Sequence, residues 1–192
     1  MALGVSVDWS QLPAPADDGA ADHLTGAAVP SVPLPATDGR TVDLAGLGGL
    51  TVVFAYPLTG RPDQPLPEGW DAIPGARGCT PEACAFRDHA ADLVKLGADH
   101  LFGLSTQDTA YQAEAAVRLR LPFALLSDAE LRLAQALRLP TFRADGRALL
   151  KRLTLVLRDG VVVRAFYPVF PPDAAAGRVI DWLAAGGPRR PV

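Results

Sequence analysis

Two cysteines, Cys79 and Cys84, are the residues of this 192-residue chain best suited to covalent chemistry, and the sequence contains no others. They stand five positions apart in the segment GCTPEACAFRD, residues 78–88. Thr80 is a good helix N-cap and Pro81 suits the first helical position, so the segment predicts a helix that begins beside Cys79. The unpaired N–H groups and the dipole at a helix start favour an anion, and therefore a thiolate.

An inert pair of buried cysteines is the main alternative, because a free cysteine is often a small apolar core residue. A zinc site is disfavoured by three features of the sequence. The spacing is Cys-x4-Cys, no second cysteine pair exists to complete four ligands, and the three histidines show no ligand spacing to the cysteines. We therefore predict no metal site.

The cysteine segment resembles the active-site segment of the peroxiredoxin Q family, also called the bacterioferritin comigratory protein family. Several positions besides the cysteines match, which makes the resemblance specific. Further matches follow in the family's order: the opening hairpin at residues 29–34 and 39–44, the strand before the active site at 52–57, and two later landmarks at 126–128 and 152–157. The resemblance spans roughly residues 29–184.

The resemblance implies an α/β protein with a thioredoxin-like fold of the peroxiredoxin type, in which helices flank a mixed central sheet. It also divides the chain into an N-terminal arm (1–28), a peroxiredoxin domain (29–185) and a C-terminal tail (186–192). The arm is rich in Ala, Asp, Gly and Pro, and we expect it to be weakly ordered.

Hydrophobic patterning and turn residues predict elements in a compatible order. After a hairpin at 32–44 and a buried strand at 50–56, a loop rich in Pro and Gly occupies residues 58–78, with Trp70 expected to hold it against the body. The remaining predicted elements are strands at 100–104, 123–126, 150–157 and 161–167, and helices at 109–118, 128–137 and 174–184. Thr109 is expected to cap the first of these helices.

The resemblance also implies roles for individual residues. Cys79 is the peroxidatic cysteine, which becomes a sulfenic acid, and Cys84 is the resolving cysteine, which condenses with it to a disulfide. Arg152 supplies the guanidinium that stabilises the thiolate and polarises the peroxide, the alternative being an exposed arginine at a strand end. Glu82 matches an acid in the same motif, and is otherwise a first-turn glutamate that favours the helix dipole.

One motif departs from the family. Peroxiredoxins usually carry Pro-x3-Thr-x2-Cys, whereas Ala72 and Ala76 precede Cys79 here. The sequence Pro57-Leu58-Thr59 lies where the motif should begin. If the long loop is an insertion between the two halves, we expect Thr59 to fold back and supply the missing hydroxyl.

The function implied by the resemblance is that of a monomeric, cofactor-free thiol peroxidase for hydrogen peroxide and alkyl hydroperoxides. A thioredoxin-like reductant would recycle it. Two alternatives remain open: a catalytically weak redox-sensing or partner-binding protein on the same scaffold, and a structural domain with inert cysteines.

Composition and charge disfavour several other classes of protein, namely disordered, nucleic-acid-binding, membrane-spanning and secreted ones. The chain is 49% hydrophobic and 20% charged, which is typical of a globular domain. A net charge of −3 with scattered basic residues gives no nucleic-acid footprint, and no apolar run approaches the ~20 residues that span a bilayer. Because the N-terminus also lacks the basic and apolar regions of a secretory signal, we predict a cytoplasmic protein.

Overall fold

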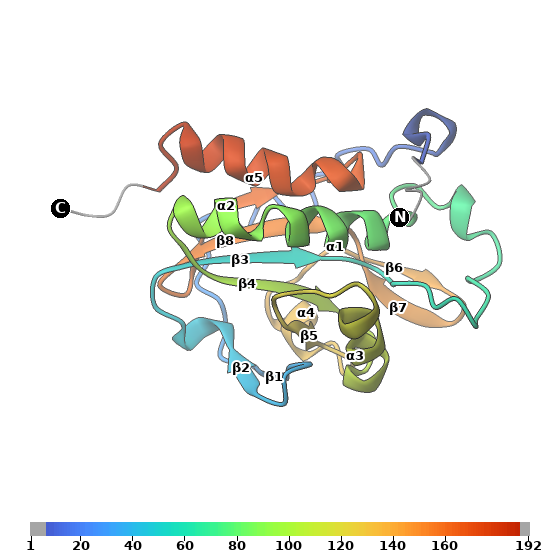
Figure 1. Cartoon of the computed structure of the whole chain (residues 1–192), viewed down its shortest axis with the longest axis horizontal. Coiled ribbons are helices and arrows are strands. Elements are labelled where there is room, and N and C mark those ends of the chain that lie inside the picture. Colours follow the sequence, from blue (N-terminus) through green and yellow to red (C-terminus); the bar gives the residue numbers. More distant parts are fainter. Residues whose placement is uncertain (1–6, 189–192) are drawn as a thin grey trace.

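A mixed five-stranded sheet forms the centre of the computed structural model, which describes residues 7–188 (Figure 1). Its strand order is β5-β4-β3-β8-β9. Parallel pairing joins β3 to β4 and β4 to β5, and antiparallel pairing joins β3 to β8 and β8 to β9. The strands are β3 (Leu50–Ala55), β4 (Ala98–Ser105), β5 (Leu125–Ser127), β8 (Leu153–Arg158) and β9 (Val161–Phe166).

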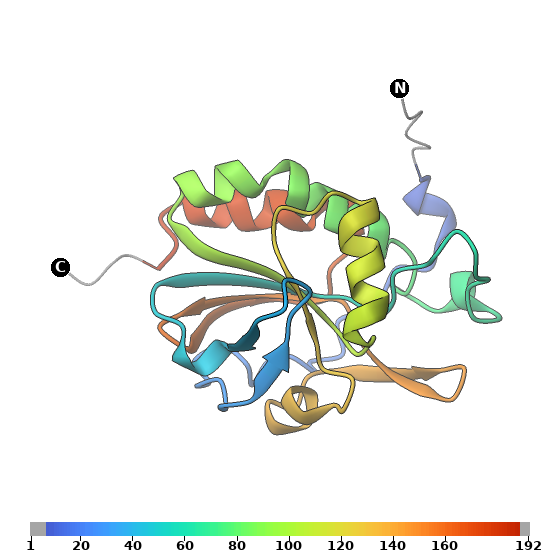
Figure 2. The same ribbon diagram turned by 60° about the horizontal axis from the view of Figure 1, so that its bottom comes forward.

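Helices and a hairpin cover the two faces of this sheet, which confirms the predicted α/β architecture. The first face carries α1 (Cys79–Asp88), α2 (Ala90–Lys95) and α5 (Ala175–Ala184). In Figures 1 and 2, α2 continues the line of α1, and α5 lies beside them. The opposite face carries the hairpin of β1 (Pro33–Pro35) and β2 (Thr41–Asp43) together with α4 (Arg132–Ala136), and α3 (Thr109–Arg118) contacts the edge strand β5. Within residues 7–188, no helix is long and apolar enough to cross a membrane.

Strand β3 supplies both cores because every one of its residues is buried. Val52 and Phe54 point into the core under α1, and Val53 and Ala55 point into the core on the other face. Phe54 stacks on Phe86 of α1 with ring centroids 4.4 Å apart and an interplanar angle of 9°. This aromatic contact sets α1 against the sheet, with the helix N-terminus at the end of β3.

The predicted strand at 150–157 is wrong in one respect, because it is two strands. Residues up to Leu150 belong to β7 (Arg147–Leu150), which pairs with β6 (Thr141–Ala144) in a separate hairpin that the sequence analysis missed. Trp70, only 4% exposed, packs against Phe142 of this hairpin with ring centroids 6.1 Å apart. The tryptophan therefore holds the long loop to the body, as predicted, but on an element that was not foreseen.

The predicted helix caps are also corrected. The helix α1 begins at Cys79 with Gly78 as N-cap, so Thr80 lies inside its first turn. Asp108 caps α3 through its side chain, and Thr109 is the first helical residue. The remaining predicted strands and helices are present within a few residues of their expected bounds.

The predicted weak order of the N-terminal arm is contradicted from residue 7 onward. Leu24 is fully buried, and the N–H of Gly26 donates to the carbonyl of Val162 at 2.7 Å. Short 3₁₀ turns lie at Trp9–Gln11, Leu44–Gly46, Trp70–Ala72 and Pro172–Ala174. The part of the arm before residue 7 and the tail beyond residue 188 lie outside the described residues.

We predict that Phe86→Ala lowers the free energy of unfolding by about 3–5 kcal/mol, because it removes a fully buried ring and leaves a cavity beneath α1. Denaturant unfolding followed by circular dichroism measures this. Val94→Ala is the control, since Val94 is 66% exposed and its loss should change stability by no more than about 0.5 kcal/mol. A cost for Phe86→Ala as small as that of the control would contradict the stack as the anchor of α1.

Candidate active site

The start of α1 and the start of β8 meet at the C-terminal end of β3. Register explains part of this meeting, because Ala55 pairs with Leu153. Arg152, which directly precedes Leu153, therefore lies just past the last residue of β3. Cys79 is the first residue of α1, and the structure brings it to the same place.

Arg152 is the centre of this site and not an exposed residue at a strand end. Its side chain is 1% exposed, and its Nη2 donates to Cys79 Sγ at 3.2 Å and to the Ala76 carbonyl at 3.2 Å. Its Nη1 donates to the carboxylate of Glu82, whose side chain is fully buried. One guanidinium thus binds the sulfur and the carboxylate through separate nitrogens, as its forked geometry allows.

Gly78 lets α1 begin where it does. Its φ is 111°, in the left-handed region that favours glycine. A Cβ at this position would also lie 2.5 Å from Pro172 and 2.9 Å from the ring of Trp9. Backbone conformation and close packing together therefore require glycine directly before Cys79.

The expectation of a lowered thiol pKa is not met in this structure, in which Cys79 is buried. Burial raises the pKa of the Cys79 thiol above its ordinary value, since the sulfur has almost no contact with solvent. The Arg152 guanidinium opposes that rise, and the Glu82 carboxylate adds to it. Burial is the largest influence on this thiol, and a favourable effect of the α1 start on the thiolate stays a prediction.

Glu82 competes with Cys79 for the single cation. Burial raises the pKa of the Glu82 carboxyl to about 7, again against the influence of Arg152. Two acidic groups therefore share one positive charge, and the cluster is neutral when one of them keeps its proton. The protonation of Cys79 is therefore coupled to that of Glu82. With a thiolate at Cys79, the cluster with Arg152 is neutral only if Glu82 is protonated. The sequence indicated only that Glu82 sits in the first helical turn.

The segment after β3 lies beside the sulfur, and contact of the Thr59 hydroxyl with a peroxide stays a prediction. The backbone of Leu58 forms a hydrogen bond to Cys79 that lowers the thiol pKa. The Thr59 hydroxyl instead donates to Gln107 Oε1 at 3.1 Å, and Gln107 Nε2 donates to the Thr59 carbonyl at 3.3 Å. The sequence gave no signal for Gln107, because its partner is 48 residues away.

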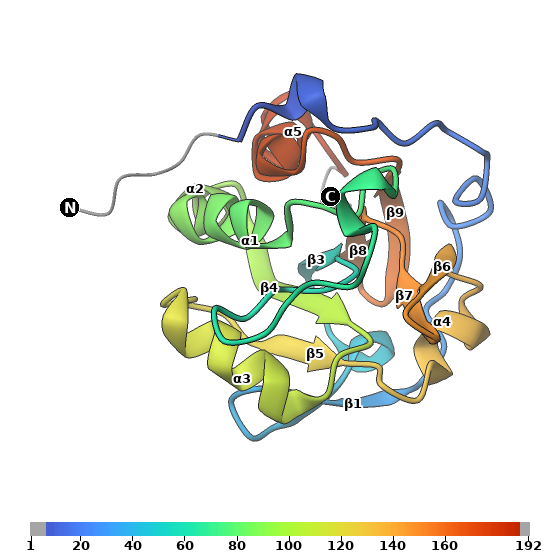
Figure 3. The same cartoon turned by 90° about the vertical axis from the view of Figure 1, so that its right-hand side faces the viewer.

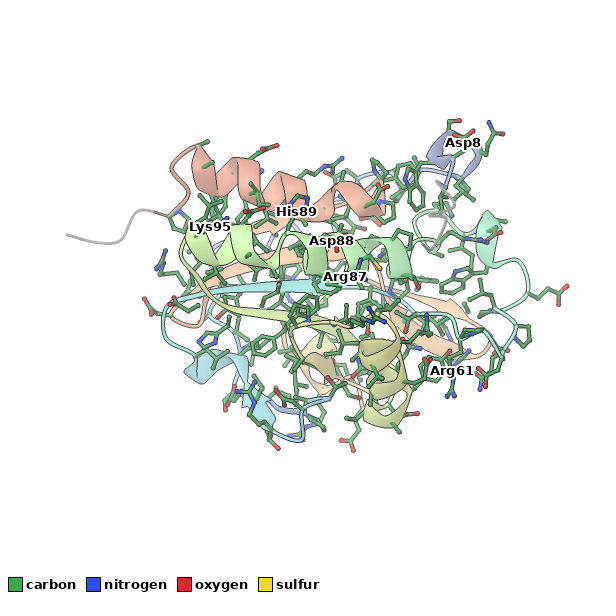
Figure 4. The ribbon with its side chains drawn as sticks, viewed as in Figure 1. Asp8, Arg61, Arg87, Asp88, His89 and Lys95 are labelled. Carbon is green, nitrogen blue, oxygen red and sulfur yellow. The ribbon has the colours of Figure 1, made fainter. Side chains whose placement is uncertain are left out.

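Cys84 is half-buried on α1 and forms no disulfide with Cys79. Residues five apart on an α-helix differ by roughly 140° in direction and by about 7.5 Å along the axis. Beyond Cys84 the helix reaches the surface, where Arg87 pairs with Asp88 (Figure 4). Among residues 7–188 no cluster of three or more His, Cys, Asp or Glu side chains is arranged to hold a metal ion.

Comparison with known proteins identifies the family. The Redoxin family matches residues 24–180. The chain is similar to the chloroplastic peroxiredoxin Q of Oryza sativa subsp. japonica, with 34% identity over 161 residues, which cover 82% of this chain and 65% of the relative. The crystal structure of peroxidoxin BcpB from Mycobacterium tuberculosis is 30% identical, with a TM-score of 0.68, and the match covers 86% of this chain and 98% of that one. The chain belongs to the peroxiredoxin Q family.

The family confirms the predicted fold. Peroxiredoxin Q of Xanthomonas campestris is 22% identical with a TM-score of 0.62, and the match covers 91% of this chain and 98% of that one. At that identity the likeness shows the shared thioredoxin-like fold. This peroxiredoxin Q chain spans about 65% of the length of the first curated plant relatives that it matches.

We predict that Arg152→Ala raises the pKa of Cys79 further and slows its oxidation by hydrogen peroxide roughly 10- to 100-fold, the loss expected for one charge-assisted hydrogen bond. Ultraviolet titration of the thiolate and stopped-flow oxidation measure the two effects. Arg147→Ala is the control, because the Arg147 side chain is 53% exposed on the β6–β7 hairpin. An unchanged pKa and rate in Arg152→Ala would show that the guanidinium contact does not act on the sulfur.

We also predict that Glu82→Gln lowers the pKa of Cys79 relative to the unchanged protein, because Arg152 then has the thiolate as its remaining anionic partner in this cluster. The control Glu114→Gln makes the same chemical change in a surface pair with Arg118. A Cys79 titration that is the same in both variants would contradict competition for one cation.

Stability should depend on pH through the same carboxyl. The folded-state pKa of Glu82, about 7, lies above its ordinary 4.5, so its contribution to stability is present below pH 4.5 and is lost as pH rises to about 7. Denaturant unfolding at pH 5 and pH 8 should therefore show that Glu82→Gln gains stability relative to the unchanged protein at the higher pH.

Proposed function

We propose that this peroxiredoxin Q chain is a thiol-dependent peroxidase that reduces hydrogen peroxide and organic hydroperoxides through Cys79. The observation that carries the proposal is the buried contact between Arg152 Nη2 and Cys79 Sγ at the first residue of a helix. Thiolate and peroxide both need hydrogen-bond donors that are fixed before the reaction, and the guanidinium supplies them without reorganisation.

The first step oxidises the sulfur by two electrons. The Cys79 thiolate attacks the outer oxygen of the hydroperoxide, so that an S–O bond forms while the O–O bond breaks. The departing oxygen takes up one proton and leaves as water or an alcohol, and the sulfur becomes a sulfenic acid. Glu82 lies on the same guanidinium and holds or releases a proton near neutral pH. We assign it the role of keeping the cluster neutral as the thiolate forms.

The second step joins the cysteines. The Cys84 sulfur attacks the sulfenic sulfur, an S–S bond forms, and the hydroxyl leaves with the thiol proton as water. A disulfide needs Cα atoms no more than about 7 Å apart, which residues five apart on an intact helix do not provide. The first turns of α1 must therefore unwind before the disulfide closes. A thioredoxin-like reductant then restores both thiols.

A redox-sensing protein on the same scaffold is the second candidate. The observations that favour it are that Cys79 is only 3% exposed and that its pKa is raised in this structure, both of which slow reaction with peroxide. Slow oxidation together with tight binding to a protein partner would support it. A monomeric state and a cytoplasmic location stay predictions.

The test compares two single variants with the unchanged protein. We expect Cys79→Ser to abolish peroxide consumption. We expect Cys84→Ser to form the sulfenic acid at the normal rate but to form no intramolecular disulfide and to fail in turnover with thioredoxin. Rapid quenching followed by mass spectrometry measures both products. If Cys84→Ser is the variant that cannot form a sulfenic acid, the two roles are reversed.

A further inference from the structure

The N-terminal arm contacts the segment that leads into Cys79, and in Figure 3 it passes over α5. Trp9 lies against Gly78, the N-cap of α1, so closely that a Cβ on Gly78 would lie 2.9 Å from its ring. Its indole Nε1 donates to Asp173 at 2.9 Å, and its ring meets Phe170 edge-on with centroids 6.2 Å apart. Trp9 is thus fixed by the segment before α5 while it packs on the start of α1.

A second contact lies three residues earlier in the loop. The N–H of Gly75 donates to the carbonyl of Pro13 at 3.3 Å. Pro15 packs on the same glycine, since a Cβ there would lie 3.1 Å from the proline ring. The arm therefore contacts the loop at both ends of the stretch 75–78, and Ala76 within that stretch accepts a hydrogen bond from Arg152.

A third contact ties the arm to the residue beside Arg152. The Asp18 carboxylate accepts from Lys151 Nζ at 2.6 Å and from the Tyr167 hydroxyl at 2.7 Å. Both donors hold the pKa of Asp18 below its usual range, so the carboxylate is ionised at neutral pH. Asp8, near the beginning of the described arm, lies far from Lys95 at the other end of the molecule (Figure 4). The part of the arm from Asp8 to Asp18 therefore lies at the active-site end, while Gly26 reaches Val162 near the β8–β9 turn.

The arm and the loop meet along a seam that is not fully packed. A cavity of about 320 Å³ lies between them, with walls that include Pro15, Asp18, Ile73, Gly75 and Arg152. Because the lining of a cavity lacks packing partners on one side, the loop is held there by fewer contacts than a fully packed segment. The contacts of Trp9, Pro13, Pro15 and Asp18 are then what resist a shift of the loop.

We infer that the arm is a clamp on the start of α1, with Trp9 and Asp18 as positioning residues that hold Cys79 in the helix and limit the rate of disulfide closure. The inference rests on the proposed two-cysteine reaction. Closure requires the first turns of α1 to unwind, and Gly78 cannot move freely while the Trp9 ring packs on it. Loosening the arm therefore raises the population of the unwound state and speeds the second step.

The test uses the full chain with four variants. Trp9→Ala removes the ring from Gly78, and Trp9→Phe keeps a ring there while it removes the hydrogen bond to Asp173. Asp18→Asn weakens the contact with Lys151 at nearly constant shape. Ser10→Ala is the control, because Ser10 is exposed and its side chain bonds only within the arm.

Two quantities are measured. The first is amide hydrogen exchange of residues 76–84 in the reduced protein, and the second is the rate of disulfide formation after a single oxidation by hydrogen peroxide. We expect Trp9→Ala to raise the exchange rate and the disulfide rate roughly 5- to 30-fold. Asp18→Asn should raise both rates by less. Trp9→Phe should exchange more slowly than Trp9→Ala, because a ring still packs on Gly78. Ser10→Ala should match the unchanged protein.

The outcomes separate the clamp from the proposed function. Unchanged exchange in both Trp9→Ala and Asp18→Asn, with the fold intact by circular dichroism, would overturn the clamp even if the disulfide forms. If the unchanged protein forms no intramolecular disulfide, the proposed reaction fails and the effect of the arm on closure fails with it, while faster exchange in Trp9→Ala would still show that the arm holds the start of α1 in the helix. A disulfide rate that stays constant while exchange rises would also overturn the inference, since unwinding would then not limit closure.

Discussion

The buried positive charge of Arg152 is the constraint on which the site depends. A guanidinium removed from water is tolerated only where anions and carbonyls surround it, and here the partners are Cys79, Glu82 and the carbonyl of Ala76. Three separate pieces of chain must therefore converge: the start of β8, the first turn of α1 and the loop before it. The pairing of β3 with β8 and the stack of Phe54 on Phe86 bring the first two together.

The same charge links reactivity to protonation. Because the Cys79 thiol and the Glu82 carboxyl share one cation, Arg152 stabilises the thiolate fully only when the carboxyl is protonated. A glutamate in the first turn of a helix would be an ordinary dipole-compensating residue on a surface. Burial converts it into a group that titrates near neutral pH, at the point where a thiol must lose its proton.

Local signals in the sequence predicted the elements that depend on local physics. The buried strand predicted at 50–56, the strand at 161–167 and the helix at 174–184 each follow from hydrophobic patterning and turn residues, and each is present in the structure. The pairing of Cys79 with Arg152 came from the resemblance to a family, because the two residues are 73 positions apart and no local pattern in the sequence indicates their contact.

Features that depend on distant partners were missed or misjudged. The β6–β7 hairpin lacks a strong alternation of buried and exposed residues. Its role in holding the long loop is visible only in the contact of Trp70 with Phe142. The sequence predicted a weakly ordered arm because its Ala, Asp, Gly and Pro residues show no hydrophobic periodicity. In the structure Trp9 and Asp18 form hydrogen bonds with residues more than 100 positions away. The thiol pKa was misjudged because a sequence shows a helix start but not the degree of burial.

The near-complete enclosure of Cys79 has a consequence for how the protein meets its surroundings. Because Cys79 is only 3% exposed, we expect its sulfur to react in the fraction of time during which the segment before α1 has moved away. Its reaction therefore reaches a ceiling set by the frequency of opening, however concentrated the oxidant becomes. Small molecules that enter during brief openings have an advantage over bulky electrophiles, which need wider ones. We therefore expect the enclosure to favour small oxidants and to slow the alkylation of the Cys79 thiol by bulky reagents.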